Sequence, residues 1–192
     1  GVRAAAEREL AQKAPLDVVN DVLVKALEEV GAGYEKGTLF LPQLIASAEA
    51  AKEAFAVVGE HMEKTAAKKG TVVLATVRGD VHDIGKNIVK VVLESYGFEV
   101  VDLGKDTPVE RVVEAAMRIQ PLAVGLSALM TTTVRSMEET VRALREKGCK
   151  SKIFVGGAVL TAEIAREIGA DYYTANALEL VKVLESLLEK KA

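Results

Sequence analysis

A histidine flanked by two aspartates is the group in this chain best suited to metal chemistry. His82 stands between Asp80 and Asp83, after an apolar stretch, Thr71–Val77, that we expect to form a strand. An imidazole that ligates a metal needs an acceptor on its other ring nitrogen, and Asp80 can be that acceptor. Gly85 would let the backbone approach a ligand closely. An ordinary turn in which Asp80 or Asp83 caps the next helix explains the same residues, so both hypotheses stay open.

Two further loops after predicted strands carry hydroxyl groups or paired glycines. The first, residues 125–133, ends in three threonines, and we expect Thr133 to cap the helix that begins near Val134. The second contains Gly156-Gly157, which forms either a tight turn or a flat platform for a planar ligand group. Because parallel strands bring their carboxyl ends to one edge of a sheet, the three loops should lie together.

From Thr71 onward, strand-like and helix-like segments alternate. The predicted strands are Thr71–Val77, Glu99–Leu103, Leu122–Ser127, Lys152–Val155 and Asp171–Thr174. Helical patterns over residues 84–95, 109–118, 134–147 and 162–168 separate them, and a last one covers residues 177–188. This alternation predicts an α/β fold with a Rossmann-like, doubly wound, parallel five-stranded sheet.

Residues 1–70 show helical periodicity instead. One pattern covers Asp17–Leu27 and a second, alanine-rich one begins after Pro42. We expect the Gly31-Ala32-Gly33 cluster and Gly37 to mark the end of the first of these helices and a short loop. The chain is therefore predicted to hold a helical bundle in residues 1–70 and an α/β domain in residues 71–192.

Composition narrows the possible functions. The chain has 192 residues, of which 49% are hydrophobic and 28% charged, as is ordinary for a globular protein. A net charge of −3 without a basic stripe argues against nucleic acid, and no apolar run reaches the roughly 18 residues of a membrane span. Its one cysteine, Cys149, excludes an intrachain disulfide and fits a cytoplasmic location. The sequence also lacks a Gly-rich phosphate loop and a Gly-x-Ser-x-Gly nucleophile motif.

Three motifs together resemble those of a known family. They are Asp80-Val81-His82-Asp83-Ile84-Gly85-Lys86-Asn87-Ile88-Val89, Gly125-Leu126-Ser127-x-Leu129 and Gly156-Gly157-Ala158. The combination resembles the cobalamin-binding module of methionine synthase, and also the corrinoid proteins of methanol, methylamine and methoxy-aromatic methyltransferase systems. Phe40-Leu41-Pro42-Gln43 resembles the signature of the helical cap before that module, so the resemblance covers essentially the whole chain.

The resemblance implies roles for particular residues. Cobalamin would bind with its dimethylbenzimidazole tail detached from cobalt and inserted into a deep slot of the α/β domain. His82 would be the lower cobalt ligand, in a relay with Asp80 and with Thr133, which replaces the serine of the family. Further cofactor contacts are implied for Gly79, Val81, Asp83, Gly85, Ser127, Leu129, Thr131, Gly156, Gly157 and Ala177.

The helical segment would act as a cap over the upper face of the cofactor. Tyr34 and Leu41 are implied to cover that face, and methionine synthases usually have phenylalanine at the position of Tyr34. Asn20 stands where a cap glutamate contacts the cofactor in some relatives.

The implied function is that of a methyl carrier rather than a complete enzyme. Its cofactor would pass through the methylcobalamin, cob(I)alamin and cob(II)alamin states. The main expectation is transfer from methyltetrahydrofolate to homocysteine, giving methionine, with homocysteine- and methyltetrahydrofolate-binding methyltransferase modules and a reductive activator as partners. The alternative is a corrinoid subunit for methanol, methylamine or methoxy-aromatic donors. A cobalamin-dependent regulator of DNA binding would need a DNA-binding segment and basic charge, which this sequence lacks.

Overall fold

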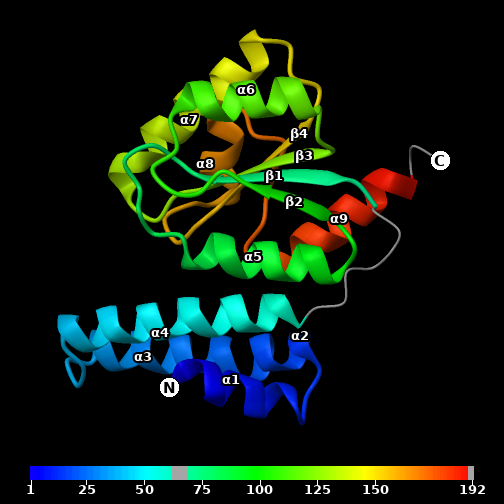
Figure 1. Ribbon diagram of the computed structural model, residues 1–192. Helices are drawn as coiled ribbons and strands as arrows, with labels where there is room; N and C mark the ends of the chain where they lie inside the picture. The colour runs from blue at the N-terminus through cyan, green and yellow to red at the C-terminus, as the bar shows by residue number, and fades with distance from the viewer. Residues whose placement is uncertain (62–68, 190–192) are drawn as a thin grey trace. The chain divides into compact units, whose positions relative to one another are not determined.

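The structure of the protein is a computed structural model, which describes residues 1–61 and 69–189 (Figure 1). The chain divides into two compact units, Gly1–Lys64 and Thr65–Ala192. None of the helices in the described ranges has the apolar length that spanning a bilayer requires.

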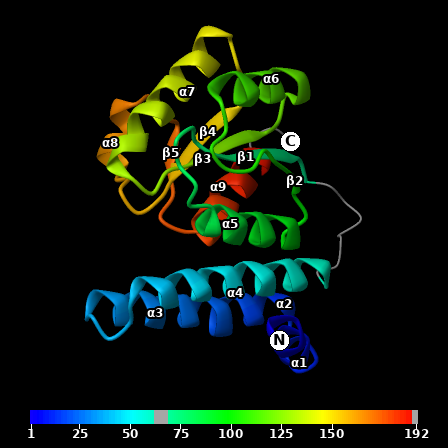
Figure 2. The ribbon, with the colours of Figure 1, turned by 60° about the vertical axis from the view of Figure 1, so that its left-hand side comes forward.

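The N-terminal unit is helical, as predicted (Figure 2). Its elements are α1 (Val2–Leu10), α2 (Pro15–Asp17), the π-helical segment η1 (Val18–Val24), α3 (Lys25–Glu35) and α4 (Leu41–Glu60). Helices α1 and α4 pack together through a buried cluster of Ala6, Ala54 and Val57. Alanines at this contact let the two helices approach closely, which explains why α4 is rich in a small, strongly helix-forming residue.

The predicted helix end is right for Gly37 and wrong for Gly31-Ala32-Gly33, because α3 continues through these three residues to Glu35. A Cβ atom on Gly33 would lie 2.9 Å from the Leu39 side chain, so this glycine makes room for the loop that folds back onto the helix. The left-handed residue after the helix is Gly37, with φ of 70°.

The described part of the C-terminal unit contains a five-stranded parallel sheet, as predicted. Its strands are β1 (Thr71–Thr76), β2 (Glu99–Asp102), β3 (Ala123–Ser127), β4 (Lys152–Gly156) and β5 (Tyr172–Tyr173). Their order, β2-β1-β3-β4-β5, reverses direction between β1 and β3. This is the flavodoxin-like form of the doubly wound sheet, in which ligands bind beyond the carboxyl ends of the strands at the point of reversal.

Helices cover both faces of this sheet (Figure 1). On one face lie α5 (Ile84–Ser95) and α9 (Ala177–Glu189); on the other lie α6 (Val109–Ile119), α7 (Val134–Glu146) and α8 (Ala162–Glu167). A short 3-10 turn, η2 (Thr131–Thr133), precedes α7. Alternate strand residues such as Val73, Val124 and Ile153 are fully buried in the core beneath α6, α7 and α8. The intervening residues therefore face α5 and α9.

Candidate functional site

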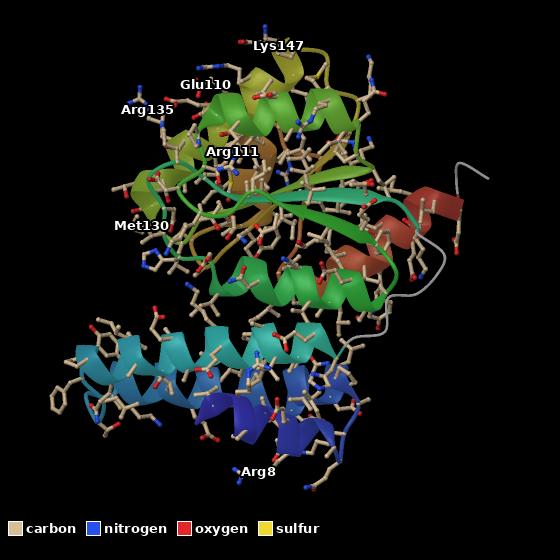
Figure 3. All side chains as sticks on the ribbon, in the orientation of Figure 1. Arg8, Glu110, Arg111, Met130, Arg135 and Lys147 are labelled. Atoms are coloured by element: carbon tan, nitrogen blue, oxygen red, sulfur yellow. The ribbon has the colours of Figure 1, made fainter. Side chains whose placement is uncertain are left out.

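The Asp80 carboxylate joins the two loops that flank the point of strand reversal. Its Oδ1 accepts hydrogen bonds from the backbone N–H of His82 at 3.0 Å and from Nδ1 of the same ring at 2.8 Å. Its Oδ2 accepts from the backbone N–H groups of Leu129 (2.8 Å) and Met130 (3.3 Å), and from the Thr133 hydroxyl (2.8 Å). Met130 lies at the carboxyl edge of the sheet, where Figure 3 labels it. Asp80 thus fixes the loop after β1 against the loop after β3.

These contacts determine the charge of Asp80 and the tautomer of His82. Burial raises the pKa of the Asp80 carboxyl, but hydrogen bonds from the backbone of His82 and Leu129 and from Thr133 outweigh it, so that pKa lies far below its usual range. An ionised carboxylate only accepts hydrogen bonds, so the proton of a neutral His82 ring sits on Nδ1. The lone pair on Nε2 is then available to a metal.

Thr133 does not act as the helix cap that the sequence predicts. It occupies the N-cap position of α7 but makes no side-chain capping hydrogen bond. Its hydroxyl lies 2.8 Å from both Asp80 Oδ2 and the carbonyl oxygen of Met130. A hydroxyl carries one proton, so these two acceptors are alternatives, and donation to the charged carboxylate is the stronger. The Thr133 hydroxyl thus hydrogen-bonds the Asp80 carboxylate and does not cap α7.

The two loops that Asp80 joins carry an exposed imidazole and exposed apolar side chains. The His82 side chain is 46% exposed, while Asp80 behind it is fully buried. Val81 and Leu129, next to these residues in the two loops, are 54% and 41% exposed. Gly85 has open space at its Cβ position and no left-handed φ, so neither packing nor backbone conformation requires a glycine there. The close approach of a ligand, which the sequence analysis expects at Gly85, would explain why a glycine stands there.

A third loop, which the sequence analysis missed, holds the histidine loop in place. Oδ1 of Asp106 accepts a hydrogen bond from the backbone N–H of Gly79 at 2.7 Å, and the Asp106 N–H donates to the Asp80 carbonyl at 2.9 Å. Asp106 has a left-handed φ of 48°, which is uncommon for a residue other than glycine. Its place between Gly104 and Pro108 is the one sequence signal, since both residues are typical of turns.

The other predicted contact residues of the α/β unit lie at the same carboxyl edge. Ser127 ends β3 and Gly156 ends β4, and the two are paired in register. A Cβ atom on Gly157 would lie 1.8 Å from the carbonyl oxygen of Ala128, so the backbone of the β4 loop packs directly on that of the β3 loop. Thr131 is exposed in η2, and Ala177 is the buried first residue of α9. Asp83 occupies the N-cap position of α5 without a side-chain cap, so the capping alternative is wrong for α5.

The predicted cap residues belong to the N-terminal unit. Asn20 is exposed in the π-helical segment η1, a geometry that is often found at functional sites. Tyr34, near the end of α3, is 45% exposed. Leu41 begins α4, and its side chain lies outside the described part of the structure. The role of these residues over a cofactor stays a prediction.

Two family models match this chain, and both are described as a B12 binding domain. One matches residues 70–182 and the other residues 1–58. The chain belongs to the B12-binding family. Cobalamin is therefore the cofactor of this B12-binding chain, as the sequence motifs predict.

Individual relatives refine the comparison. The chain is 41% identical over 191 residues to dimethylamine corrinoid protein 2 of Methanosarcina mazei. The alignment covers 97% of this chain and 89% of the relative. The monomethylamine corrinoid protein of Methanosarcina barkeri matches with a TM-score of 0.82 and 32% identity, covering 96% of each chain. The methanol:cobalamin methyltransferase complex of Methanosarcina barkeri matches with a TM-score of 0.62 and 35% identity, covering 93% of this chain and 69% of that one.

These relatives correct the main functional expectation. They belong to methylamine and methanol systems, and the methionine synthase hypothesis finds no support among them. The alternative, a corrinoid protein for another methyl donor, is the better supported one.

Proposed function

We propose that this B12-binding protein is the corrinoid subunit of a methylamine methyltransferase system. It would carry a methyl group for a separate methyltransferase subunit, with dimethylamine as the first donor to test, because a dimethylamine corrinoid protein is 41% identical to it. The observation that carries the proposal is the hydrogen-bonded series His82–Asp80–Thr133. It leaves Nε2 of a half-exposed ring without a hydrogen-bond partner among the described residues.

The residues at this edge fit a cobalamin. Nε2 of His82 would ligate the cobalt, and the exposed Val81 and Leu129 would supply apolar contacts to the cofactor. The open space at Gly85 would allow the cofactor close to the start of α5. When bound, cobalamin would supply a cobalt atom that takes a methyl group from the donor and gives it up to a thiol acceptor.

Asp80 and Thr133 would control how firmly His82 donates to the metal. The Asp80 carboxylate holds the proton on Nδ1 and orients the ring, which leaves the lone pair of Nε2 as the donor to a metal. The Thr133 hydroxyl and the backbone N–H groups of Leu129 and Met130 keep that carboxylate charged. A change in the Thr133 hydrogen bond, from Asp80 to the Met130 carbonyl, would weaken this support without moving the backbone.

Electron paramagnetic resonance of the cobalt(II) form tests the ligand directly. The protein would be produced with 15N-labelled histidine and loaded with unlabelled hydroxocobalamin, then reduced to cobalt(II). Ligation by His82 predicts that the nitrogen splitting changes multiplicity with the label, because nitrogen from the cofactor's own benzimidazole is unlabelled. His82→Gly should abolish this change, whereas His61→Gln, which alters the other histidine of the chain, should leave it intact. A splitting that ignores the label would disprove histidine ligation.

The methyl donor is tested separately, with methyltransferase subunits for dimethylamine, trimethylamine, monomethylamine and methanol and with methyltetrahydrofolate plus its methyltransferase module. With the bound cofactor first reduced chemically to cob(I)alamin, we expect one of the methylamine subunits to methylate it, which absorption spectroscopy would detect. If only methyltetrahydrofolate with its methyltransferase module methylates the cofactor, the methylamine assignment is wrong and the cofactor assignment still holds.

A further inference from the structure

Thr76, at the end of β1, carries a buried hydroxyl without a partner. The residue is fully buried, and its Oγ1 makes no hydrogen bond within the described part of the chain. Its backbone groups are both satisfied, since its N–H donates to the Gly104 carbonyl and its carbonyl accepts from the Thr107 N–H. Leaving a buried hydroxyl unpaired is costly, so the side chain needs an explanation that the folded chain alone does not provide.

The hydroxyl faces α5 and α9 rather than the aliphatic core. Ala75 and Val77, on either side of Thr76 in the chain, both belong to the core cluster beneath α6, α7 and α8. Successive residues of a strand point to opposite faces of the sheet, so Thr76 points to the other face. Both α5 and α9 begin at the carboxyl edge that this face shares with the His82 loop (Figure 1).

Thr76 belongs to a row of small polar residues across three strands. It pairs in register with Ser127 on β3, and Ser127 pairs with Gly156 on β4. The Ser127 hydroxyl is half-buried and, like that of Thr76, has no hydrogen-bond partner among the described residues. Two residues earlier on these strands, the same face carries apolar side chains instead. There Phe154 on β4 stacks on Tyr172 on β5, with ring centroids 4.9 Å apart. A buried hydroxyl without a partner, on Thr76, therefore stands beside the partly exposed hydroxyl of Ser127, next to apolar residues of the same face.

We infer that Thr76 is a further cofactor-binding residue, whose hydroxyl hydrogen-bonds the nucleotide tail of cobalamin. This inference rests on the proposed function and adds to it a contact that the sequence motifs do not include. A cobalamin whose nucleotide tail is detached from cobalt would offer hydrogen-bond partners to these hydroxyls. Its tail carries an aromatic base with a free nitrogen acceptor, a ribose hydroxyl and a phosphodiester. The apolar residues of this face suit the ring of that base, and the two hydroxyls suit its polar atoms.

Thr76→Val separates a ligand contact from a structural role, because valine has nearly the shape of threonine and lacks the hydroxyl. The variant should bind hydroxocobalamin about tenfold more weakly than the wild type, as expected for one lost hydrogen bond. It should bind diaquocobinamide, which has no nucleotide tail, as tightly as the wild type does. Without cofactor, its midpoint of thermal unfolding should not fall, since the removed group has no partner in the protein. Thr76→Ser should restore tight binding of hydroxocobalamin.

Thr140→Val is the matched control. Thr140 is equally buried, but its hydroxyl donates to the Ser136 carbonyl within α7 at 2.7 Å. This variant should bind both corrinoids normally. If Thr76→Val binds hydroxocobalamin like the wild type, or loses affinity for both corrinoids equally, the inferred contact is wrong although the proposed function stands. If the wild type itself fails to bind hydroxocobalamin, the proposed function fails first, so the two failures are distinguishable.

Discussion

The two faces of the parallel sheet are made by the same strands and yet differ in what they bury. Toward α6, α7 and α8, the strands present aliphatic residues such as Val73, Val124 and Val155, which are at most 1% exposed. Toward α5 and α9, the carboxyl ends of the same strands present Thr76 and Ser127. The first face supplies the close-packed apolar contact that stabilises the domain, and the second replaces part of that contact with polar side chains at its carboxyl edge.

Helix attachment differs between the faces as well. The buried ammonium group of Lys86 on α5 donates to Oδ1 of Asp102 on β2 at 2.6 Å, and the Lys86 side chain is only 2% exposed. On the opposite face, α7 contributes buried apolar residues such as Met137 and Leu144. Helix α5 also buries the apolar side chains of Val91, Val92 and Leu93, so the ion pair adds a directional contact near its start to the apolar contacts along its length.

The largest expected effect is the difference in stability between two variants, each of which truncates one residue on one face. Ile153→Ala removes a fully buried side chain from the aliphatic face and should lower the free energy of unfolding by about 2–5 kcal/mol. Ser127→Ala, on the other face, should change it by less than about 0.5 kcal/mol, because it removes a hydroxyl with no partner in the protein. Urea denaturation of both variants without cofactor measures the difference.

Cofactor affinity should show the reverse order. Folded Ile153→Ala should bind hydroxocobalamin like the wild type, and Ser127→Ala should bind it more weakly. Equal losses of stability in the two variants would mean that the second face is an ordinary structural core, and the comparison between the faces would fail.

The sequence allowed the prediction of much of this arrangement. The strands and helices after residue 70 follow from alternating patterns that turn residues separate, and Ile84–Ser95 was predicted to the residue. The grouping of His82 with Asp80 follows from local spacing and with Thr133 from the resemblance. Asp106 was missed because its contact with Gly79 depends on how the β2–α6 loop folds over another loop, which no periodicity reveals. The buried state of Lys86 was missed because a lysine on a helix is usually exposed.

Asp102 makes the attachment of α5 sensitive to acid. Burial raises the pKa of its carboxyl, but hydrogen bonds from Lys86 and from the Gly104 N–H outweigh it, so that pKa lies below its usual value. A carboxyl with a lowered pKa in the folded state stabilises the fold above its unfolded pKa, about 3.9, and this contribution is lost as pH falls through the folded pKa. We therefore expect the wild type to lose unfolding free energy below about pH 4.

Asp102→Asn isolates this contribution from those of other carboxylates. Its difference in unfolding free energy from the wild type should be constant near neutral pH and should shrink as the pH falls below about 4. Urea denaturation of both proteins from neutral to acidic pH measures it. A difference that stays constant throughout this range would show that the Lys86–Asp102 pair does not contribute through its charge.

Only a small change in stability is expected for variants of Asp106, and here the readout is the geometry of His82. Asp106→Asn keeps an acceptor for the Gly79 N–H and a side chain that tolerates a left-handed φ. Asp106→Gly keeps the backbone conformation but removes the acceptor, and Asp106→Ala loses both. Each of the last two should cost about 1 kcal/mol of unfolding free energy at most, because Asp106 is exposed.

The spectroscopic result should separate the three variants more clearly than stability does. If the hydrogen bond to Gly79 positions the histidine loop, the fraction of cobalt(II) with a histidine nitrogen ligand should fall in the glycine and alanine variants and be retained in the asparagine variant. Loss of the ligand in all three would assign the effect to the negative charge of Asp106. Retention in all three would show that Asp80 alone, with its contacts to both loops, is enough to hold His82 in position at the carboxyl edge of the sheet.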